Sequence, residues 1–125
     1  MIVAKKSSRI VQSYYKKRNS DAISYALTQI KSAKIASYVK NIYLYGSSAR
    51  NNQSFDSDID LLIVLEESFH KEKNKSLFLS DLVSKLNETE TYLPEIEPRF
   101  VIGDKWKIKN DTFYENVRKE GIQIW

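Results

Sequence analysis

The chain contains no cysteine and a single histidine, and both features limit its chemistry. Without cysteine there can be no disulfide, iron-sulfur cluster or thiolate zinc site, and such a composition is typical of reducing compartments. Because His70 is the only imidazole, a bound metal would be held mainly by carboxylates. These are the ligands of hard ions such as Mg²⁺.

Long apolar runs are also missing. The opening sequence MIVAKKSSR lacks the apolar core of a signal peptide, and no segment is long enough to cross a bilayer. We therefore expect a cytoplasmic protein with no membrane contact. Its 125 residues suffice for one ordinary domain, but not for a catalytic domain with a separate substrate domain of usual size.

Negative charge is scarce in the first part of the chain. Residues 1–40 contain nine lysines and arginines but only one acid, Asp21, whereas acids exceed bases in residues 41–125. A basic segment could attract nucleic acid, nucleotide phosphates or an acidic partner. The simplest interpretation is a solvated helix face, and we favour it over a nucleic-acid-binding surface.

The first part of the chain has the pattern of two helices. Short polar residues over 19–21 are typical of a helix start, and apolar residues then recur at helical spacing, so we expect one helix over 21–38. An earlier helix is expected over 8–17. Residues 1–19 would thus form a basic helical segment, and residues 20–125 a single domain.

From residue 41 onward the period changes to that of strands. β-Branched and aromatic residues predict strands over 41–45, 58–65 and 95–102, and helical patterns recur over 74–88 and 110–121. The second strand is an almost unbroken apolar run, which is typical of a central strand covered on both faces. Pro98 cannot donate to a ladder, so the third strand is expected at an edge or a bulge. This order predicts one α/β (α+β) domain.

Two aspartates mark the start of the second strand. Asp58 and Asp60 are two residues apart, so their side chains leave the same face while Ile59 and Leu61 point the other way. Unpaired carboxylates at the mouth of a buried strand lose hydration, and a divalent ion would compensate. The alternative is that both acids lie just outside the sheet and only end the strand.

A glycine-serine pair follows the first strand. Gly46 permits a tight turn and close approach of a ligand, and the N-H groups after it, with the Ser47 hydroxyl, can bind phosphate. Arg50 could reach the same phosphate. An ordinary strand-to-helix turn would also explain these residues. Together with the aspartates, however, the turn forms the combination that phosphoryl transfer from a nucleoside triphosphate needs.

The segment YGSSARNNQSFDSDIDLLIV, residues 45–64, resembles the signature of the DNA polymerase beta-like nucleotidyltransferases, and the chain looks most like the minimal members of that superfamily. The resemblance implies the nucleotidyltransferase fold, a small mixed sheet with helices packed on it. It also implies that Gly46, Ser47 and Arg50 bind the triphosphate of ATP. Asp58 and Asp60 would bind Mg²⁺, with two ions expected.

The family often has a third carboxylate on a neighbouring strand, which helps to hold the metal and accepts the proton of the attacking hydroxyl. By position Glu97 is the candidate, and Glu95, two residues away on the same face, is the second choice. The alternative is that both are solvent-facing acids beside Pro98. If neither glutamate acts as the third carboxylate, the protein could bind nucleotide but transfer slowly or not at all.

The resemblance implies transfer of AMP to an acceptor hydroxyl on a protein or a small molecule. Many minimal members pair with a helical HEPN partner as its antitoxin, and a homo-oligomer is the other assembly to expect. The competing hypothesis is a non-catalytic module that binds nucleotide or a partner through a degenerate site. A third hypothesis is nucleic-acid binding through residues 5–18, which predicts an affinity for nucleic acid that falls steeply as the salt concentration rises.

Overall fold

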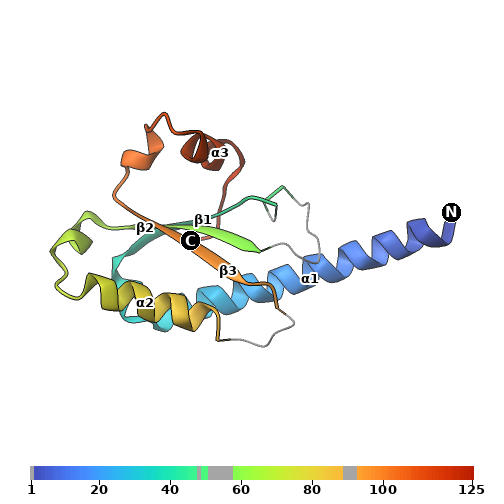
Figure 1. Cartoon of the computed structure of the whole chain (residues 1–125), viewed down its shortest axis with the longest axis horizontal. Coiled ribbons are helices and arrows are strands. Elements are labelled where there is room, and N and C mark those ends of the chain that lie inside the picture. Colours follow the sequence, from blue (N-terminus) through green and yellow to red (C-terminus); the bar gives the residue numbers. More distant parts are fainter. Residues whose placement is uncertain (1, 48, 51–57, 89–92) are drawn as a thin grey trace.

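The computed structural model describes residues 2–47, 49–50, 58–88 and 93–125, with the backbone alone for residues 2–13 and 15. The predicted loop between Arg50 and Asp58 lies outside the described residues. In the part that is described, three α-helices surround a four-stranded sheet (Figure 1). The predicted α/β class is therefore confirmed.

The sheet is mixed and has the order β3-β2-β1-β4. Strand β1 (Val39–Tyr45) pairs antiparallel with β2 (Ile59–Leu65), and β2 pairs parallel with β3 (Ile96–Ile102). Strand β4 (Ile122–Gln123) pairs antiparallel with β1. The central position of the apolar strand and the edge position of the strand with Pro98 are both confirmed, whereas β4 was not expected.

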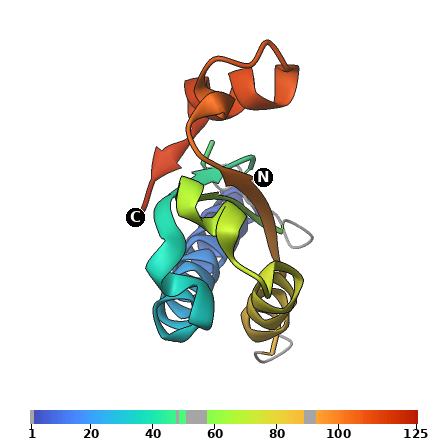
Figure 2. The same ribbon diagram turned by 90° about the vertical axis from the view of Figure 1, so that its left-hand side faces the viewer.

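Helices cover both faces of the sheet. Figure 2 shows α1 (Ile2–Ser32) and α2 (Lys75–Leu86) on one side, and α3 (Thr112–Glu120) on the other. The larger core lies under α1 and α2, and β2 contributes alternate residues to it, namely Ile59, Leu61, Ile63 and Leu65. The intervening Leu62 and Val64 pack on the α3 side with Trp106 and Val117. Every β2 residue except Asp60 is buried.

The expected helix start at residues 19–21 is wrong, because α1 runs through it without interruption. Asn19 is buried, and an ion pair of 3.4 Å between Lys17 and Asp21 spans the expected boundary. Polar residues that favour caps are tolerated inside a helix when their side chains find partners there, and no glycine or proline breaks this stretch. The division of the chain into a basic segment, residues 1–19, and a domain, residues 20–125, stays a prediction.

The helix also ends earlier than expected. It stops at Ser32, Ala33 is extended, and a 3-10 turn, η1 (Lys34–Tyr38), leads into β1. At its other end α1 extends away from the sheet (Figure 1). Among the described residues, no helix combines the length and the apolar character that crossing a membrane requires.

Burial in the core of the sheet predicts which leucine substitutions destabilise the protein. Leu61→Ala removes a fully buried side chain of β2, and we expect it to lower the free energy of unfolding by about 2–5 kcal/mol. The matched control is Leu77→Ala on α2, where the side chain is 57% exposed and alanine is a better helix former. Urea denaturation measures both. Equal losses in the two variants would contradict the burial described here.

Candidate active site

Four acidic residues meet at one end of the sheet. Asp58 directly precedes β2 and Glu95 directly precedes β3, and the backbone N-H of Ile59 donates to the carbonyl of Glu95 over 2.9 Å. One residue further along, Asp60 and Glu97 are partners in the parallel register. Parallel pairing brings the starts of both strands to the same edge, so residues far apart in the sequence become neighbours.

Three of these acids are close enough to share an ion. One carboxylate oxygen from each of Asp58, Glu95 and Glu97 lies within 4.8 Å of the others. We call these three residues the acidic cluster. Glu95 and Glu97 are exposed and Asp58 is half-buried, so the cluster opens to solvent. Oxygen-only donor sets of this kind fit a hard divalent cation better than zinc or copper.

Electrostatics within the cluster favour added positive charge. The pKa of Glu97 is raised, mainly because its carboxyl is hydrogen-bonded to Asp58 and repelled by the charge there. Burial and the neighbouring charges of Asp60 and Glu95 act in the same direction. Two carboxylates that approach this closely hold either a proton or a cation between them. The donor set therefore fits a metal ion.

Asp60 lies between the acidic cluster and the first turn. It is half-buried, and its pKa is raised first by burial and then by Asp58, while Arg50 and Arg99 lower it. A Cβ atom placed on Gly46 would come within 2.5 Å of its Oδ2 atom. The Asp60 carboxylate is thus directed to the turn after β1, and its oxygens are not among those of the cluster.

The turn after β1 needs glycine for two reasons. Gly46 has φ of +75°, a conformation that residues with a side chain rarely adopt, and Asp60 occupies the space a Cβ would need. The backbone N-H of Arg50 closes the turn by donating to the carbonyl of Gly46 over 3.1 Å. Ser47 is in the same turn and half-buried. Gly46 thereby stands next to an aspartate.

Arg50 is not free in this structure. Its Nη1 atom lies 3.0 Å from Oε2 of Glu120 at the end of α3, and both side chains are partly exposed. Its charge nevertheless acts on Asp60 and opposes part of the rise in the pKa of that group that burial and Asp58 cause. The predicted phosphate-binding arginine is therefore near the acids, but held by a carboxylate that a ligand would have to replace.

A family model described as polymerase beta, nucleotidyltransferase matches residues 28–125. The chain belongs to this nucleotidyltransferase family. Among solved structures it is similar to a putative nucleotidyltransferase from Sulfolobus solfataricus, with 18% identity, a TM-score of 0.48, and coverage of 95% of this chain and 86% of that one. Comparison with curated proteins gives no match. The family resemblance of residues 45–64 is thus confirmed.

The candidate site contains two residues that the sequence analysis did not identify. Arg99 follows Glu97 by two residues on β3, and its guanidinium carbon lies 4.0 Å from the ring centroid of Phe113 on α3. Tyr45 is the register partner of Asp60 and packs edge-on against the same Phe113 ring at 5.2 Å. Burial and the charge of Asp60 raise the pKa of Tyr45. Alternate residues of a strand lie on the same face, so the position of Arg99 two residues after Glu97 was a sequence signal that could have identified it.

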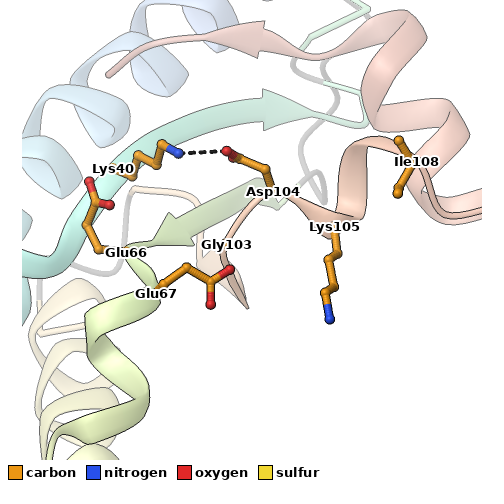
Figure 3. Close-up of a pocket in the computed structure, with 7 residues that line it drawn as sticks. All are labelled: Lys40, Glu66, Glu67, Gly103, Asp104, Lys105 and Ile108. Carbon is orange, nitrogen blue, oxygen red and sulfur yellow. Dashed lines mark hydrogen bonds and ion pairs between the residues drawn. The ribbon is translucent and has the colours of Figure 1, made fainter.

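A pocket of this nucleotidyltransferase domain, shown in Figure 3, lies away from the acidic cluster. It is a cavity of about 280 Å³ at the ends of β2 and β3, lined by residues that include Lys40, Glu66 and Asp104. It lies about 20 Å from the acidic cluster, because β2 has seven residues and the two features are at opposite ends of that strand. Lys40 and Asp104 already pair at 2.7 Å. Because this pocket does not contain the acids that the parallel strands bring together, we place the chemistry at the acidic cluster.

Substituting the turn glycine tests whether the turn and the acids work together. Gly46→Ala and the matched control Gly103→Ala both force alanine to φ of +75°, which costs each about 1–2 kcal/mol of stability. Gly103 faces the exposed side chain of Glu67, which can move aside, whereas Gly46 faces Asp60. We expect only Gly46→Ala to weaken binding of Mn²⁺ with ATP, measured by electron paramagnetic resonance. Unchanged binding in Gly46→Ala would contradict the proposed coupling.

Proposed function

We propose that the protein is a Mg²⁺-dependent nucleotidyltransferase that moves AMP from ATP to an acceptor hydroxyl and releases pyrophosphate. The observation that carries this proposal is the meeting of Asp58, Asp60 and Glu97 at one end of the sheet, beside the Gly46 turn. The family match over residues 28–125 supports a transferase. The choice of ATP as the donor and of AMP as the transferred group follows from the family resemblance.

The carboxylates would hold the metal. Asp58 and Glu97 belong to the acidic cluster, and Asp60 would join them by rotation of its side chain toward the cluster, with Glu95 as a further oxygen donor. Bound Mg²⁺ would neutralise charge on the triphosphate and on the departing pyrophosphate. The remaining groups of the site belong to the chain itself, and their chemistry follows from their positions.

Each of the other residues has a role in this proposal. Backbone N-H groups of the turn at Gly46 and the Ser47 hydroxyl would donate to phosphate oxygens. The acceptor oxygen forms a bond to the α-phosphorus as the bond from that phosphorus to the bridging oxygen breaks, and pyrophosphate leaves with the electron pair. Glu97 would accept the proton of the acceptor hydroxyl on a carboxylate oxygen, since its side chain is exposed to solvent beside Asp58.

The acceptor and the biological setting are finer proposals. A hydroxyl on a partner protein, in particular a HEPN-type partner that this protein would neutralise as an antitoxin in the cytoplasm, is the acceptor that the family resemblance favours. A small-molecule hydroxyl is the other enzymatic choice. The exposed face of the acidic cluster supports an external acceptor, because a substrate can approach Glu97 from solvent.

Labelled ATP tests the transfer directly. The protein is incubated with Mg²⁺, cell lysate, and ATP labelled either at the α-phosphate or at the γ-phosphate. We expect label from the α-phosphate alone in the acceptor, and a loss of about a hundredfold or more in Asp58→Asn/Asp60→Asn, the order expected when groups that stabilise transition-state charge are removed.

The control for this experiment is Asp81→Asn, which neutralises a surface carboxylate of α2 paired with Lys85. It should label as the wild type does. Equal labelling by the wild type and the double variant would rule out the proposed site. Retention of ATP binding without any labelled acceptor would instead support the non-catalytic module.

The Arg50–Glu120 pair gives a prediction about affinity. If Arg50 binds the triphosphate, Arg50→Ala should raise KM for ATP by about tenfold, the equivalent of one lost charge-assisted hydrogen bond. Glu120→Gln should lower KM because it frees the arginine. Neither should change stability by more than about 1 kcal/mol, since the pair is exposed. Steady-state kinetics measure both.

Lys119→Ala is the matched control for Arg50→Ala, because it removes one exposed positive charge from the neighbouring helix. It should leave KM unchanged. An equal rise of KM in Lys119→Ala and Arg50→Ala would mean that general electrostatic attraction, and not a contact of Arg50, binds the nucleotide.

A further inference from the structure

The outer edge of β3 has two different halves. The N-H of Ile59 donates to the carbonyl of Glu95, and the N-H of Gly103 donates to the carbonyl of Leu65 over 2.8 Å. In the parallel ladder between these two hydrogen bonds, the backbone N-H and C=O groups of odd-numbered β3 residues therefore point toward β2 and form hydrogen bonds with it. Even-numbered residues direct their backbone groups outward, because β3 is the terminal strand of the sheet.

The first half of this outer edge is closed. The Asn87 side chain accepts a hydrogen bond from the N-H of Ile96 over 3.0 Å and donates to its carbonyl over 3.1 Å, as a neighbouring strand would. Pro98 comes next in the outward set and has no N-H to offer. Asn87 and Pro98 thus leave the first half of the β3 edge without a free N-H group that could pair with another strand.

The second half of the edge is open. Within the described chain, the outward N-H and C=O groups of Phe100 and Ile102 have no hydrogen-bond partner. Both side chains are half-buried. Exposed strand edges of this kind readily accept another strand, and natural proteins usually block them. We call the backbone of these two residues the open edge.

A basic groove lies along the open edge. The cavity has a volume of about 460 Å³, and its walls include Phe100, Ile102, Lys105, Lys109 and His70, with no acidic residue among the described residues that line it. The wall is firmly held, because Arg118 donates to the carbonyls of Trp106 and Lys109 over 2.7 and 2.9 Å. The groove is therefore a positively charged surface beside unpaired backbone groups.

We propose that the open edge binds an extended acidic segment of another protein, which adds to the sheet as a further strand. The backbone groups of Phe100 and Ile102 would pair with the segment, as in other cases of strand addition. Glutamate or aspartate side chains of the segment would lie against Lys105 and Lys109.

The same charges argue against a second copy of this chain as the occupant. Two open edges facing each other would bring Lys105 and Lys109 of both copies together, and like charges across paired strands are destabilising. The groove thus selects for an acidic strand and against self-association. This surface is independent of the acidic cluster, since it lies at the other half of β3.

Hydrogen exchange followed by NMR tests this proposal with two synthetic peptides. One alternates threonine and valine with glutamate, and the other has lysine in place of every glutamate. In the free protein the amides of Phe100 and Ile102 should exchange fast and those of Arg99 and Val101 slowly. At a concentration about nine times its dissociation constant, the glutamate peptide should slow exchange at the first two amides about tenfold, because only free protein exchanges there.

Charge reversal sharpens the test. In Lys105→Glu/Lys109→Glu the preference should invert, so that the lysine peptide protects the two amides and the glutamate peptide does not. The control Lys34→Glu/Lys119→Glu makes the same change of net charge at exposed positions away from the groove, and should keep the wild-type preference. The comparison of the two peptides on the wild-type protein remains decisive if the reversed variant does not fold.

Three results would overturn the proposal. The first is the absence of protection by either peptide, and the second is equal protection by both. The third is protection of Phe100 and Ile102 that increases with protein concentration when no peptide is present, because it would mean that a second copy covers the edge.

Discussion

The parallel pairing of β2 and β3 is the constraint on which the candidate site depends. It sets the starts of two distant segments side by side, and so collects Asp58, Asp60, Glu95 and Glu97 at one edge. Mutual repulsion of these carboxylates opposes the arrangement. The opposing gain comes from the aliphatic side of β2, which is buried against α1 and α2 and fixes the register. The core thus holds the acids together.

Alternation along the strands places aliphatic and charged residues on different faces of the sheet. The aliphatic residues of β2 supply stability on one face, while Asp60, Glu97 and Arg99 lie on the face that α3 covers. The missing side chain of Gly46 lets the turn after β1 approach Asp60. Acidic side chains, a basic side chain and the turn proposed to bind phosphate can therefore occupy a small region without disturbing the core.

Much of this arrangement could be predicted from local patterns. The unbroken apolar run predicted the central strand, Pro98 predicted the edge, and a spacing of two residues predicted that Asp58 and Asp60 share a face. The resemblance added Glu97 and Glu95 as partners of the aspartates, and the structure brings both to Asp58. Their roles in catalysis stay predictions.

Features that depend on distant contacts could not be predicted. The continuity of α1 depends on the burial of Asn19 and on the Lys17–Asp21 pair. Strand β4 has two residues, too few for a periodic signal, and forms because β1 offers a free edge. The positions of Arg99 over Phe113 and of Arg50 beside Glu120 depend on where α3 packs, and short-range patterns do not contain that information.

The central claim is that the carboxylates at the start of β2 and β3 bind a divalent ion with nucleotide. Anomalous diffraction from crystals grown with Mn²⁺ and a non-hydrolysable ATP analogue tests it most directly. We predict an anomalous peak within coordination distance of Asp58, Asp60 and Glu97, with the triphosphate against the turn at Gly46. A peak confined to the pocket of Glu66, Glu67 and Asp104, or nucleotide bound away from the turn, would contradict the account.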